Sequence, residues 1–240
     1  MMPVDFHTHI LPGIDDGSRN TEESIDLLKT EKSQGIKTVI ATPHFYPHED
    51  TPQRFLNRRQ KAYEKLMEAI DAQDGLPQII MGAEVYYFKG ISEWQNLKDL
   101  AIQGTDYLLL EMPLGKWSDS MFDDIEGIYT KRGLVPIIAH IDRYIGFFNT
   151  NKMMKRLGNM PVIIQANGNY FINKKTRAKA LKLLKKRGIN IIGSDCHNMS
   201  VRKPNLGLAA EIIKEQLGEE YINRINLTEK EILSDLYITI

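Results

Sequence analysis

The architecture of this chain is laid out in its first residues, VDFHTHILPGIDDGS at 4–18. A short apolar strand, Val4–Phe6, leads directly into His7-Thr8-His9 and then into a loop that holds Asp15 and Asp16. Side chains on an extended strand repeat every two residues, so His7 and His9 face the same side and can grip one cation. In an isolated His-x-His, the two histidines can also be solvent-exposed residues at a strand end. The residues that follow the other predicted strands distinguish this interpretation from a metal site.

Further short apolar runs follow at intervals along the chain. The strands that we expect are Val4–Phe6, Thr38–Thr42, Gln78–Met81, Tyr107–Glu111, Val135–Ala139, Val162–Gln165 and Asn190–Gly193. Several runs are continuously apolar and rich in β-branched residues. Continuous apolarity is typical of parallel strands covered on both faces, whereas a strand with one wet face alternates.

Amphipathic patterns between these runs predict helices. The first begins after Asn20, an N-cap with Glu23 as its capping-box partner, and extends to about Gln34. The other helices are expected at Pro52–Ala72, Met121–Arg132, Lys174–Arg187, Leu206–Leu217 and, near the end of the chain, Thr228–Leu236. Glycines that end three of the helices before the next strand, Gly35, Gly133 and Gly188, indicate repeated βα units. Seven such units without a glycine-rich phosphate loop predict one α/β barrel domain over residues 1–240.

Composition narrows the class of protein. Lys plus Arg and Asp plus Glu both number 31, so the formal net charge is zero. This balance argues against a general nucleic-acid binder, which usually carries a basic excess. The single cysteine, Cys196, cannot form an intrachain disulfide. The first residues do not resemble a signal peptide and no apolar run is long enough to span a membrane, so we expect a cytoplasmic enzyme.

Polar residues with metal-binding side chains follow the predicted strands. In parallel α/β barrels the active site forms at the carboxyl ends of the strands, where such residues converge. The candidate ligands are His7, His9, Asp16, His44, Glu84, Glu111, His140, Asp195 and His197. A mixture of imidazole and carboxylate suits Zn, Mn or Fe. The sequence therefore favours the metal interpretation of His7-Thr8-His9.

Carboxylates in three of these segments could also have a role other than metal binding, as a turn former, an ordinary charge or one member of a buried pair. Asp15 is expected to be a turn former, because Asp-Gly-type sequences favour turns, which leaves Asp16 as the ligand. Glu84 is either an ordinary charge or a ligand that the small residues Gly82-Ala83 bring close to the site. Glu111 follows three leucines and needs a partner, because a lone buried carboxylate is costly.

Two arginines lie close in sequence to the candidate ligands. Arg143 follows His140 by three residues, and Arg202 follows His197 by five. Near a metal cluster, such arginines indicate an anionic substrate held by fork-shaped hydrogen bonds. The alternative is a pair of solvated loop arginines.

Several of these segments together resemble the polymerase-and-histidinol-phosphatase (PHP) superfamily. They are HTH at 7–9, LPGIDDGS at 11–18, ATPH at 41–44, GAE at 82–84, LE at 110–111, AHIDR at 139–143 and GSDCHN at 193–198. Within the superfamily they look most like the bacterial manganese-dependent protein-tyrosine phosphatases of capsular and exopolysaccharide synthesis. The resemblance runs in order from the first strand to about Asn205.

The resemblance implies a distorted (β/α)7 barrel of the PHP fold with three divalent metal ions, Mn in preference to Fe or Zn. It implies one metal on His7, His9, Glu84 and Asp195, a second on Glu84, Glu111 and His140, and a third on Asp16, His44 and His197. It also implies that Arg143 and Arg202 hold the phosphate of a phosphotyrosine protein, an autophosphorylating bacterial tyrosine kinase. The chain departs from the family's pattern in two places, since the family often has Pro-Glu at Ile141-Asp142 and Ala at Cys196.

The mechanism that we expect is direct hydrolysis by a hydroxide between two metals, with Asp142 and His48 as weak candidates for a general acid. A rival lies in Cys196–Arg202, which matches the Cys-x5-Arg loop of cysteine-dependent phosphatases but leaves the strand-end ligands unexplained. Within the superfamily, a histidinol-phosphate phosphatase or a proofreading nuclease is the alternative.

Two further features allow more than one interpretation. The basic residues of the predicted helix Lys174–Arg187 are expected to form a solvated face. The alternative is a non-catalytic binding protein that uses this helix to dock an acidic tail or a membrane surface. Four aromatic residues after the ligand-bearing strands either stack on a tyrosine ring or pack on the barrel rim: Phe45, Tyr46, Phe147 and Phe148.

Overall fold

Parallel strands joined by helices form the centre of the molecule. The computed structural model describes residues 2–70, 75–147 and 149–234. Its strands are β1 (Val4–Thr8), β2 (Thr38–Ala41), β3 (His44–Phe45), β4 (Gln78–Met81), β5 (Glu84–Tyr86), β6 (Tyr107–Glu111), β7 (Val135–Ile138), β8 (Ile163–Asn167) and β9 (Ile191–Gly193). Strands this short suit a small barrel, in which each strand crosses only the wall.

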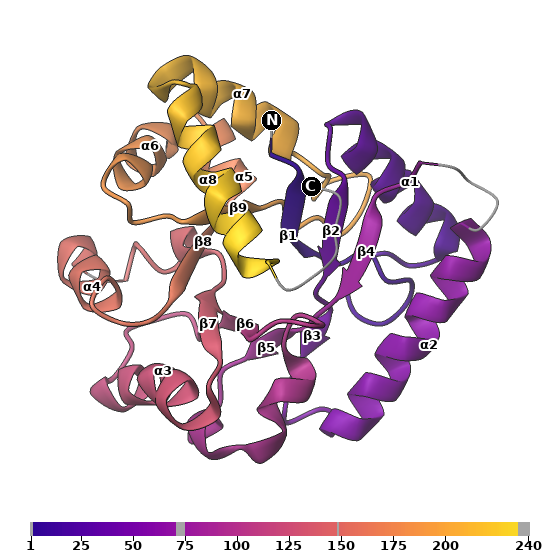
Figure 1. Cartoon of the computed structure of the whole chain (residues 1–240), viewed down its shortest axis with the longest axis horizontal. Coiled ribbons are helices and arrows are strands. Elements are labelled where there is room, and N and C mark those ends of the chain that lie inside the picture. Colours follow the sequence, from indigo (N-terminus) through magenta and orange to yellow (C-terminus); the bar gives the residue numbers. More distant parts are fainter. Residues whose placement is uncertain (1, 71–74, 148, 235–240) are drawn as a thin grey trace.

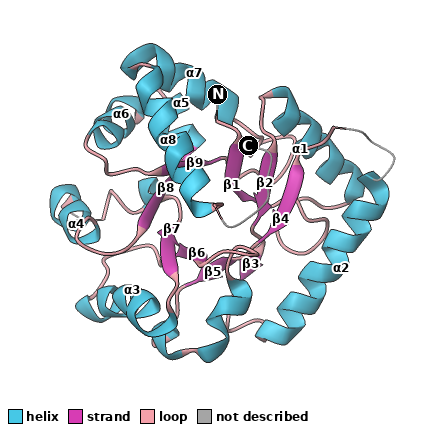
Figure 2. Ribbon diagram, viewed as in Figure 1, coloured by secondary structure: helices cyan, strands magenta, loops and turns pink. Residues whose placement is uncertain are grey.

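All the strand pairs are parallel, and together they form a curled sheet. The order is β1-β2-β4 in one part and β3-β5-β6-β7-β8-β9 in the other. The first and last strands also lie side by side, because the backbone N–H of Asp195 donates to His7 O at 2.8 Å and that of His9 donates to Cys196 O at 2.9 Å. The sheet therefore wraps around an axis as in a TIM-like fold (Figure 2).

Helices surround the sheet (Figure 1). They are α1 (Thr21–Ser33), α2 (Pro52–Ile70), α3 (Asp119–Arg132), α4 (Thr150–Leu157), α5 (Gly168–Ile172), α6 (Arg177–Lys185), α7 (Leu206–Leu217) and α8 (Glu219–Ile232), with 3-10 turns at Ile91–Glu93, Gln95–Leu100 and Ile141–Arg143. The last helix crosses in front of the strands in this view, and its Ile232 packs in the same cluster as Val4 and Phe6. Helix α8 thus closes the end of the barrel that lies opposite the strands' carboxyl ends.

Two apolar layers explain why the strands are apolar at every position. Along β6, Leu109 belongs to the inner cluster with Phe6, Ile40 and Ile137. Its neighbours Leu108 and Leu110 belong to the outer cluster, which lies between the strands and the helices. Because both faces of the sheet are buried, neither needs polar residues. The expectation of parallel strands covered on both faces is confirmed.

The predicted strands are found within two residues of their expected ends, but two short strands were missed. Strands β3 and β5 continue the lines of β2 and β4 after the breaks at Thr42-Pro43 and Gly82-Ala83. They have two and three residues, too few to show a pattern in the sequence. Both nevertheless carry a candidate ligand at their first position.

The predicted helices differ from the observed ones mainly at their ends. Helix α2 ends at Ile70, so the expected Asp71 and Ala72 lie outside the described residues. Helix α6 begins at Arg177, because residues 174–176 form a turn. Helix α8 begins nine residues before the expected Thr228, and Leu236 lies outside the described residues. Helices α4 and α5 were not predicted.

The helix caps show which local signals were interpreted correctly. Asn20 caps α1, since its Oδ1 accepts from the backbone N–H of Glu23 at 2.9 Å. The capping-box prediction for Glu23 is wrong, because its carboxylate accepts from the backbone N–H of Arg19 instead. Gly133 ends α3 with φ 68°, but after α6 the left-handed residue is Arg187, with φ 58°, and not Gly188.

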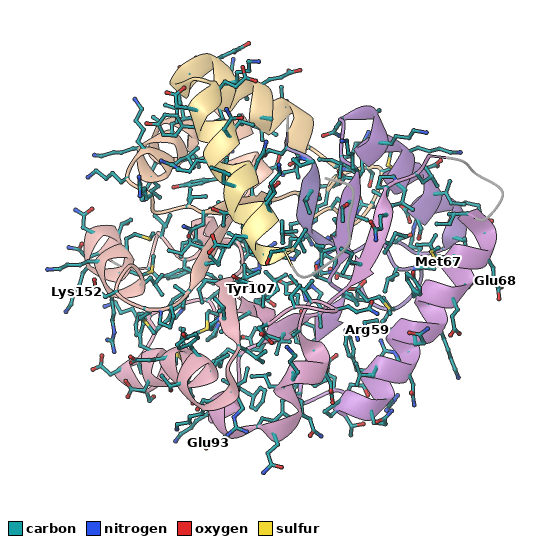
Figure 3. All side chains as sticks on the ribbon, in the orientation of Figure 1. Arg59, Met67, Glu68, Glu93, Tyr107 and Lys152 are labelled. Atoms are coloured by element: carbon teal, nitrogen blue, oxygen red, sulfur yellow. The ribbon has the colours of Figure 1, made fainter. Side chains whose placement is uncertain are left out.

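A buried cation links a helix to the strand layer. In Figure 3 the side chain of Arg59 turns inward from α2, whereas those of Glu68 and Lys152 point away from the molecule. The Arg59 guanidinium donates to Gly82 O at 2.7 Å, and burial lowers the pKa of Arg59 to about 10. Arg59 therefore holds the backbone turn that precedes Glu84. Within residues 2–70, 75–147 and 149–234, no helix is both long and apolar enough to cross a membrane.

Candidate metal centre

The carboxyl ends of the strands bring all nine predicted ligands into one cluster. His7 and His9 leave β1, His44 and Glu84 begin β3 and β5, and Glu111 ends β6. His140 follows β7 by two residues, while Asp195 and His197 follow β9. Asp16 reaches the cluster from the loop before α1. Six of the nine side chains are buried, whereas those of His44, Glu111 and Asp16 are 10%, 14% and 66% exposed.

Glu84 lies at the middle of the cluster. Its Oε2 is 3.1 Å from His7 Nε2, 3.3 Å from His9 Nε2 and 3.0 Å from His44 Nδ1. Its Oε1 is 2.8 Å from His140 Nε2. A carboxylate that meets four imidazoles with its two oxygens has the geometry of a bridging ligand, and not that of a charge left at a strand end.

The remaining ligands extend the cluster in three directions. Asp195 Oδ1 is 3.5 Å from His7 Nε2. Asp16 Oδ1 is 3.3 Å from His197 Nε2 and 3.5 Å from His44 Nε2. Glu111 Oε1 is 3.5 Å from His140 Nε2. Groups of donor atoms within 4.8 Å of one another, each able to hold one ion, are His9-Asp16-His44-His197, His7-His9-Asp195 and His44-Glu84-Glu111.

The donor atoms fit divalent cations because several of them are buried and have no hydrogen-bond partner among the described residues. Buried atoms without a hydrogen-bond partner include Glu84 Oε2, Glu111 Oε2, His44 Nδ1 and His197 Nε2. The Nε2 atoms of His7 and His9 face each other at 3.2 Å, although two imidazole lone pairs repel at that distance. Cations would give each of these lone pairs a partner, and His with Asp and Glu suits Zn, Mn or Fe.

The histidines and carboxylates of the cluster shift one another's pKa values. Burial lowers the pKa of His9, but Asp15 and Glu84 outweigh it and raise the value to about 10. Burial likewise opposes protonation of His140, and Glu111 with Glu84 raises its pKa to about 9. Burial would raise the pKa of Glu84, yet His7, His140 and His44 hold it well below its usual range. Protons and metal ions therefore compete for the same atoms.

Backbone strain also marks the site. Three non-glycine residues of the described chain have a positive φ, and two of them are His140 at 30° and Asp195 at 55°. Both follow directly on buried strands. A left-handed conformation costs a non-glycine residue about 1–3 kcal/mol and persists where the surrounding structure enforces it. Here it turns each side chain from the strand towards the cluster.

Two residues that position the ligands were not recognised in the sequence. Asp15 is the turn former that we expected, since its Oδ1 accepts from Gly17 N at 3.0 Å. Its Oδ2 also accepts from His9 Nδ1 at 2.7 Å and from His44 N at 3.0 Å. Gln165 Oε1 accepts from His140 N at 2.6 Å and lies 3.4 Å from His7 Nδ1. Both orient imidazoles whose other nitrogen faces the cluster.

The two predicted arginines lie over the cluster. Arg143 Nη2 donates to Asp195 Oδ2 at 2.5 Å, and Arg202 Nη2 donates to Asp195 Oδ1 at 2.6 Å. Their side chains are 34% and 32% exposed, so both reach solvent at the mouth of the site. Paired, half-buried arginines beside a cluster of candidate metal ligands are suited to an oxyanion such as a phosphate. The interpretation as free solvated arginines is wrong.

The candidates for a general acid or a nucleophile, His48, Asp142 and Cys196, make other contacts in the structure. His48 is 67% exposed and faces Glu49 outside the cluster. Asp142 Oδ1 accepts from the backbone N–H of Asn167 at 2.9 Å. The Cys196 thiol is fully buried against Glu31, and burial raises its pKa well above the usual range. A cysteine in this state is a poor nucleophile, so the Cys-x5-Arg interpretation is wrong.

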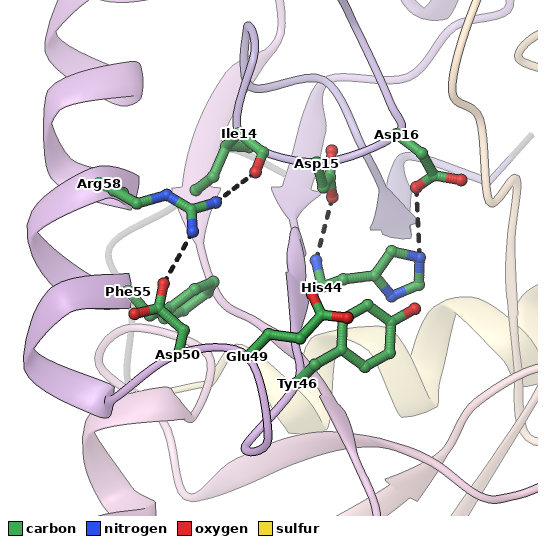
Figure 4. A pocket seen from close by; sticks show the side chains of 9 residues that line it. All are labelled: Ile14, Asp15, Asp16, His44, Tyr46, Glu49, Asp50, Phe55 and Arg58. Carbon is green, nitrogen blue, oxygen red and sulfur yellow. Dashed lines mark hydrogen bonds and ion pairs between the residues drawn. The ribbon is translucent and has the colours of Figure 1, made fainter.

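A pocket of about 310 Å³ opens beside the cluster, between the Asp15-Asp16 loop and the start of α2 (Figure 4). Tyr46 lines it and stacks on His44 with ring centroids 5.0 Å apart. Phe45 is instead a core residue, packed on Phe55 and Trp94. Phe147 is 46% exposed, and Phe148 lies outside the described residues. Of the three predicted aromatic residues that the structure describes, Tyr46 is thus the one that stacks on a candidate ligand.

Known proteins resemble this chain over almost its whole length. The family described as capsular polysaccharide synthesis, CpsB/CapC, matches residues 3–233. Tyrosine-protein phosphatase CpsB of Streptococcus agalactiae is 28% identical over 98% of this chain and 100% of its own length. Tyrosine-protein phosphatase YwqE of Bacillus subtilis is 25% identical over 90% and 86%.

The fold has a solved counterpart. A crystal structure from work on YwqE of B. subtilis and CpsB of Streptococcus pneumoniae, described as unique metal-dependent tyrosine phosphatases, superposes with a TM-score of 0.86. It shares 23% identity, and the match covers 98% of this chain and 96% of that one. The resemblance expected from the sequence motifs is confirmed. With a match from residue 3 to residue 233, the chain belongs to the CpsB/CapC family of capsular polysaccharide synthesis.

Proposed function

We propose that this protein is a metal-dependent protein-tyrosine phosphatase. The observation that carries the proposal is the cluster of five histidines and four carboxylates around Glu84, with Arg143 and Arg202 at its mouth. Such a site can bind a phosphoryl group and activate water. Membership of the CpsB/CapC family and relatives named tyrosine-protein phosphatases support phosphotyrosine as the substrate.

We propose three divalent ions in this site, with Mn favoured over Fe or Zn. The first would be held by His7, His9, Glu84 and Asp195, the second by Glu84, Glu111 and His140, and the third by Asp16, His44 and His197. The short distances from Glu84 to four imidazoles support its role as a bridge. The strand order supports a distorted (β/α)7 barrel of the PHP fold as a single domain, if β2 with β3 and β4 with β5 each count as one broken strand.

In this mechanism the chain supplies position and charge. When bound, the ions would lower the pKa of water and neutralise charge on the phosphoryl group. Arg143 and Arg202 would exchange their contacts with Asp195 for the phosphoryl oxygens, with their guanidinium groups arranged for bidentate contacts. Asp15 and Gln165 would keep the imidazoles of His9 and His7 in the tautomers that leave Nε2 free. A phenolate leaves readily, so the site has little need of a general acid.

The biological setting follows from the family. We propose that the substrate is an autophosphorylating bacterial tyrosine kinase that controls capsular or exopolysaccharide synthesis, and that the enzyme acts in the cytoplasm. The name CpsB, shared by several of the relatives, supports this setting. The alternative is a histidinol-phosphate phosphatase of the same superfamily, which would act on a small phosphomonoester.

Removal of metal tests the proposal directly. We expect chelator to abolish hydrolysis of a phosphotyrosine peptide and added Mn to restore it, with up to three ions per chain by elemental analysis. Cys196→Ser should retain most of the activity, because the buried thiol has no part in the reaction. A Cys196→Ser protein without activity, together with a wild-type protein that ignores chelator, would falsify the mechanism.

A choice of substrates separates the alternatives. Phosphotyrosine peptide, histidinol phosphate and single-stranded DNA should be compared at the same Mn concentration. We expect kcat/KM to be highest for the peptide. A higher value for histidinol phosphate would assign the site to the other branch of the superfamily.

A further inference from the structure

Charge is distributed unevenly along this neutral chain. Residues 143–194 contain twelve Lys and Arg and no Asp or Glu. Because 31 minus 12 leaves 19 Lys and Arg against 31 Asp and Glu, the rest of the chain carries a net charge of −12. The basic segment begins at Arg143 in the metal centre and continues through α4 and α6. The exposed surfaces of α4 and α6 are therefore basic and suited to an acidic partner.

A groove lies where this basic segment packs beside the start of α3. It has a volume of about 340 Å³ and lies between the first turns of α3 and α4, and we call it the α3–α4 groove. Trp117, Phe122 and Met153 form its apolar floor, while Lys116 and Lys152 stand at its edge. Both lysines are exposed, and Figure 3 shows Lys152 pointing away from the fold.

The charged residues of the groove leave it with an excess of positive charge. The acidic residue in the lining, Asp119, pairs with Arg156, whose guanidinium also lies 3.9 Å over the Phe122 ring. Among the residues that the structure describes, neither Lys116 nor Lys152 lies within ion-pairing distance of a carboxylate. Arg156 and, to a smaller extent, the charge of Lys152 nevertheless lower the pKa of Asp119. With Arg156, the lining has three cations and one carboxylate, so the groove carries a net charge of +2 above an apolar floor.

One buried aromatic ring separates the groove from the metal centre. Tyr144 is fully buried, with its ring centroid 5.6 Å from that of His140 and 5.0 Å from that of Trp117. The backbone that carries Arg143 continues into the groove, which Phe147 also lines. A polypeptide whose phosphate lies at Arg143 would therefore place residues a few positions away at the α3–α4 groove.

We propose that the α3–α4 groove binds acidic residues that flank the phosphotyrosine in the substrate protein. This inference rests on the proposed function and adds a preference for one class of sequence. A concave, part-apolar site with two cations next to the reacting group favours a polypeptide over a flat membrane surface. Exposed lysines of α6, such as Lys179 and Lys182, would add long-range attraction without contacting the peptide.

The test compares phosphotyrosine peptides that differ only in flanking charge. One peptide has three Glu before the phosphotyrosine, a second has them after it, and a third has Gln at all these positions. We expect the wild-type protein to show a kcat/KM about three- to tenfold higher for one acidic peptide than for the neutral one. The preference should decline between about 0.05 M and about 0.5 M NaCl, because exposed charges are screened.

Variants then locate the preference. Lys116→Ala/Lys152→Ala should lose most of it, and Lys152→Glu should favour a peptide that has Lys in place of Glu. Lys179→Ala/Lys182→Ala makes the same charge change on α6, removes only long-range attraction, and should keep most of the preference. An equal loss in both double variants would overturn the groove as its source.

The outcomes for the function and for the groove differ. A wild-type protein that hydrolyses p-nitrophenyl phosphate and all three peptides equally well would overturn the groove and leave the proposed function intact. Binding to anionic vesicles without any preference among the peptides would do the same and would point to a membrane. A protein that hydrolyses no phosphomonoester with Mn would overturn the proposed function, and this inference with it.

Discussion

Single carboxylates in this protein do more than their sequence context suggests. Asp15 looks like a turn residue, and it is one, but its second oxygen receives both His9 Nδ1 and the backbone N–H of His44. One side chain thereby orients ligands that lie on two strands. Burial would raise the pKa of Asp15, yet the charge and hydrogen bond of His9 hold it below the usual range. Asp15 is thus an anion that orients two candidate ligands, His9 and His44.

Asp15→Asn should therefore weaken metal binding. Asparagine has one accepting oxygen instead of two, so either His9 Nδ1 and His44 N or Gly17 N loses its acceptor, and the negative charge beside His9 is lost in both cases. Loss of such an outer partner typically costs 10- to 100-fold in metal affinity or activity. Titration with Mn, followed by calorimetry and by activity, measures the change. Asp26→Asn, at an exposed position of α1, is the matched control and should have wild-type affinity. Equal affinities in the two variants would remove Asp15 from the positioning role.

Among the elements, the contact between the first and last strands shapes the site most directly. A side chain at Gly193 in β9 would place its Cβ 2.6 Å from His7 Cβ and 2.8 Å from Gln165 Nε2. The absence of a side chain there lets β9 approach β1, so that Asp195 can bond to the backbone of His7. The closure of the sheet and the placement of two candidate ligands thus depend on one glycine.

Gly193→Ala is expected to damage both stability and metal binding. The added methyl has no free space, and overpacking of this kind costs about 1–3 kcal/mol. The shift should separate His7 from Asp195 and reduce the metal content. Urea denaturation of the metal-free protein, with elemental analysis of the loaded one, measures both effects. Gly146→Ala is the control, since a Cβ at Gly146 meets nothing within 4 Å. A Gly193→Ala protein as stable as this control would contradict the close approach.

At the scale of the whole molecule, the two ends of the barrel use buried carboxylates differently. At the carboxyl ends of the strands they face histidines and can hold metal ions. At the other end, Glu229 of α8 is fully buried, and neither of its oxygens has a hydrogen-bond partner within the part of the chain that the structure describes. Burial and the nearby Asp5 raise the pKa of Glu229 well above its usual range. Glu229 is therefore a cost to folding at neutral pH.

Glu229→Leu should stabilise the protein near neutral pH. The folded-state pKa of Glu229 is raised, so the unfolded chain releases a proton that the folded one keeps, and stability falls as pH rises above the ordinary Glu pKa of 4.5. Leucine removes this loss, and we expect a gain of about 1–3 kcal/mol in unfolding free energy at pH 7.5.

The comparison with an exposed neighbour isolates the effect of burial. The gain from Glu229→Leu over wild type should shrink as the pH is lowered towards 4.5, where the unfolded state also keeps the proton. Glu231→Leu, at an exposed site on the same helix, should change stability little at either pH. Denaturant melts of the three proteins at both values provide the measurement. A destabilised Glu229→Leu protein would mean that the carboxylate has a partner.

Local patterns in the chain are sufficient for seven of the nine strands and for the choice of the nine candidate ligands. Apolar runs such as Gln78–Met81 and Tyr107–Glu111 have the observed bounds, because burial on both faces leaves a mark in consecutive residues. A ligand directly after such a run lies at the rim by the geometry of parallel strands alone. The N-cap at Asn20 is equally local, since donor and acceptor are three residues apart.

Only the tertiary structure determined the side-chain contacts between residues that lie far apart in the sequence. Gln165 meets His7 across 158 positions of sequence, and Trp117 comes near the metal centre only through Tyr144. The left-handed backbone at His140 is similarly enforced by packing, because an isolated residue would avoid that conformation. A one-dimensional pattern records which residues are buried and where strands end. It does not record which side chains meet once the sheet has closed, and those meetings align the ligands and form the α3–α4 groove.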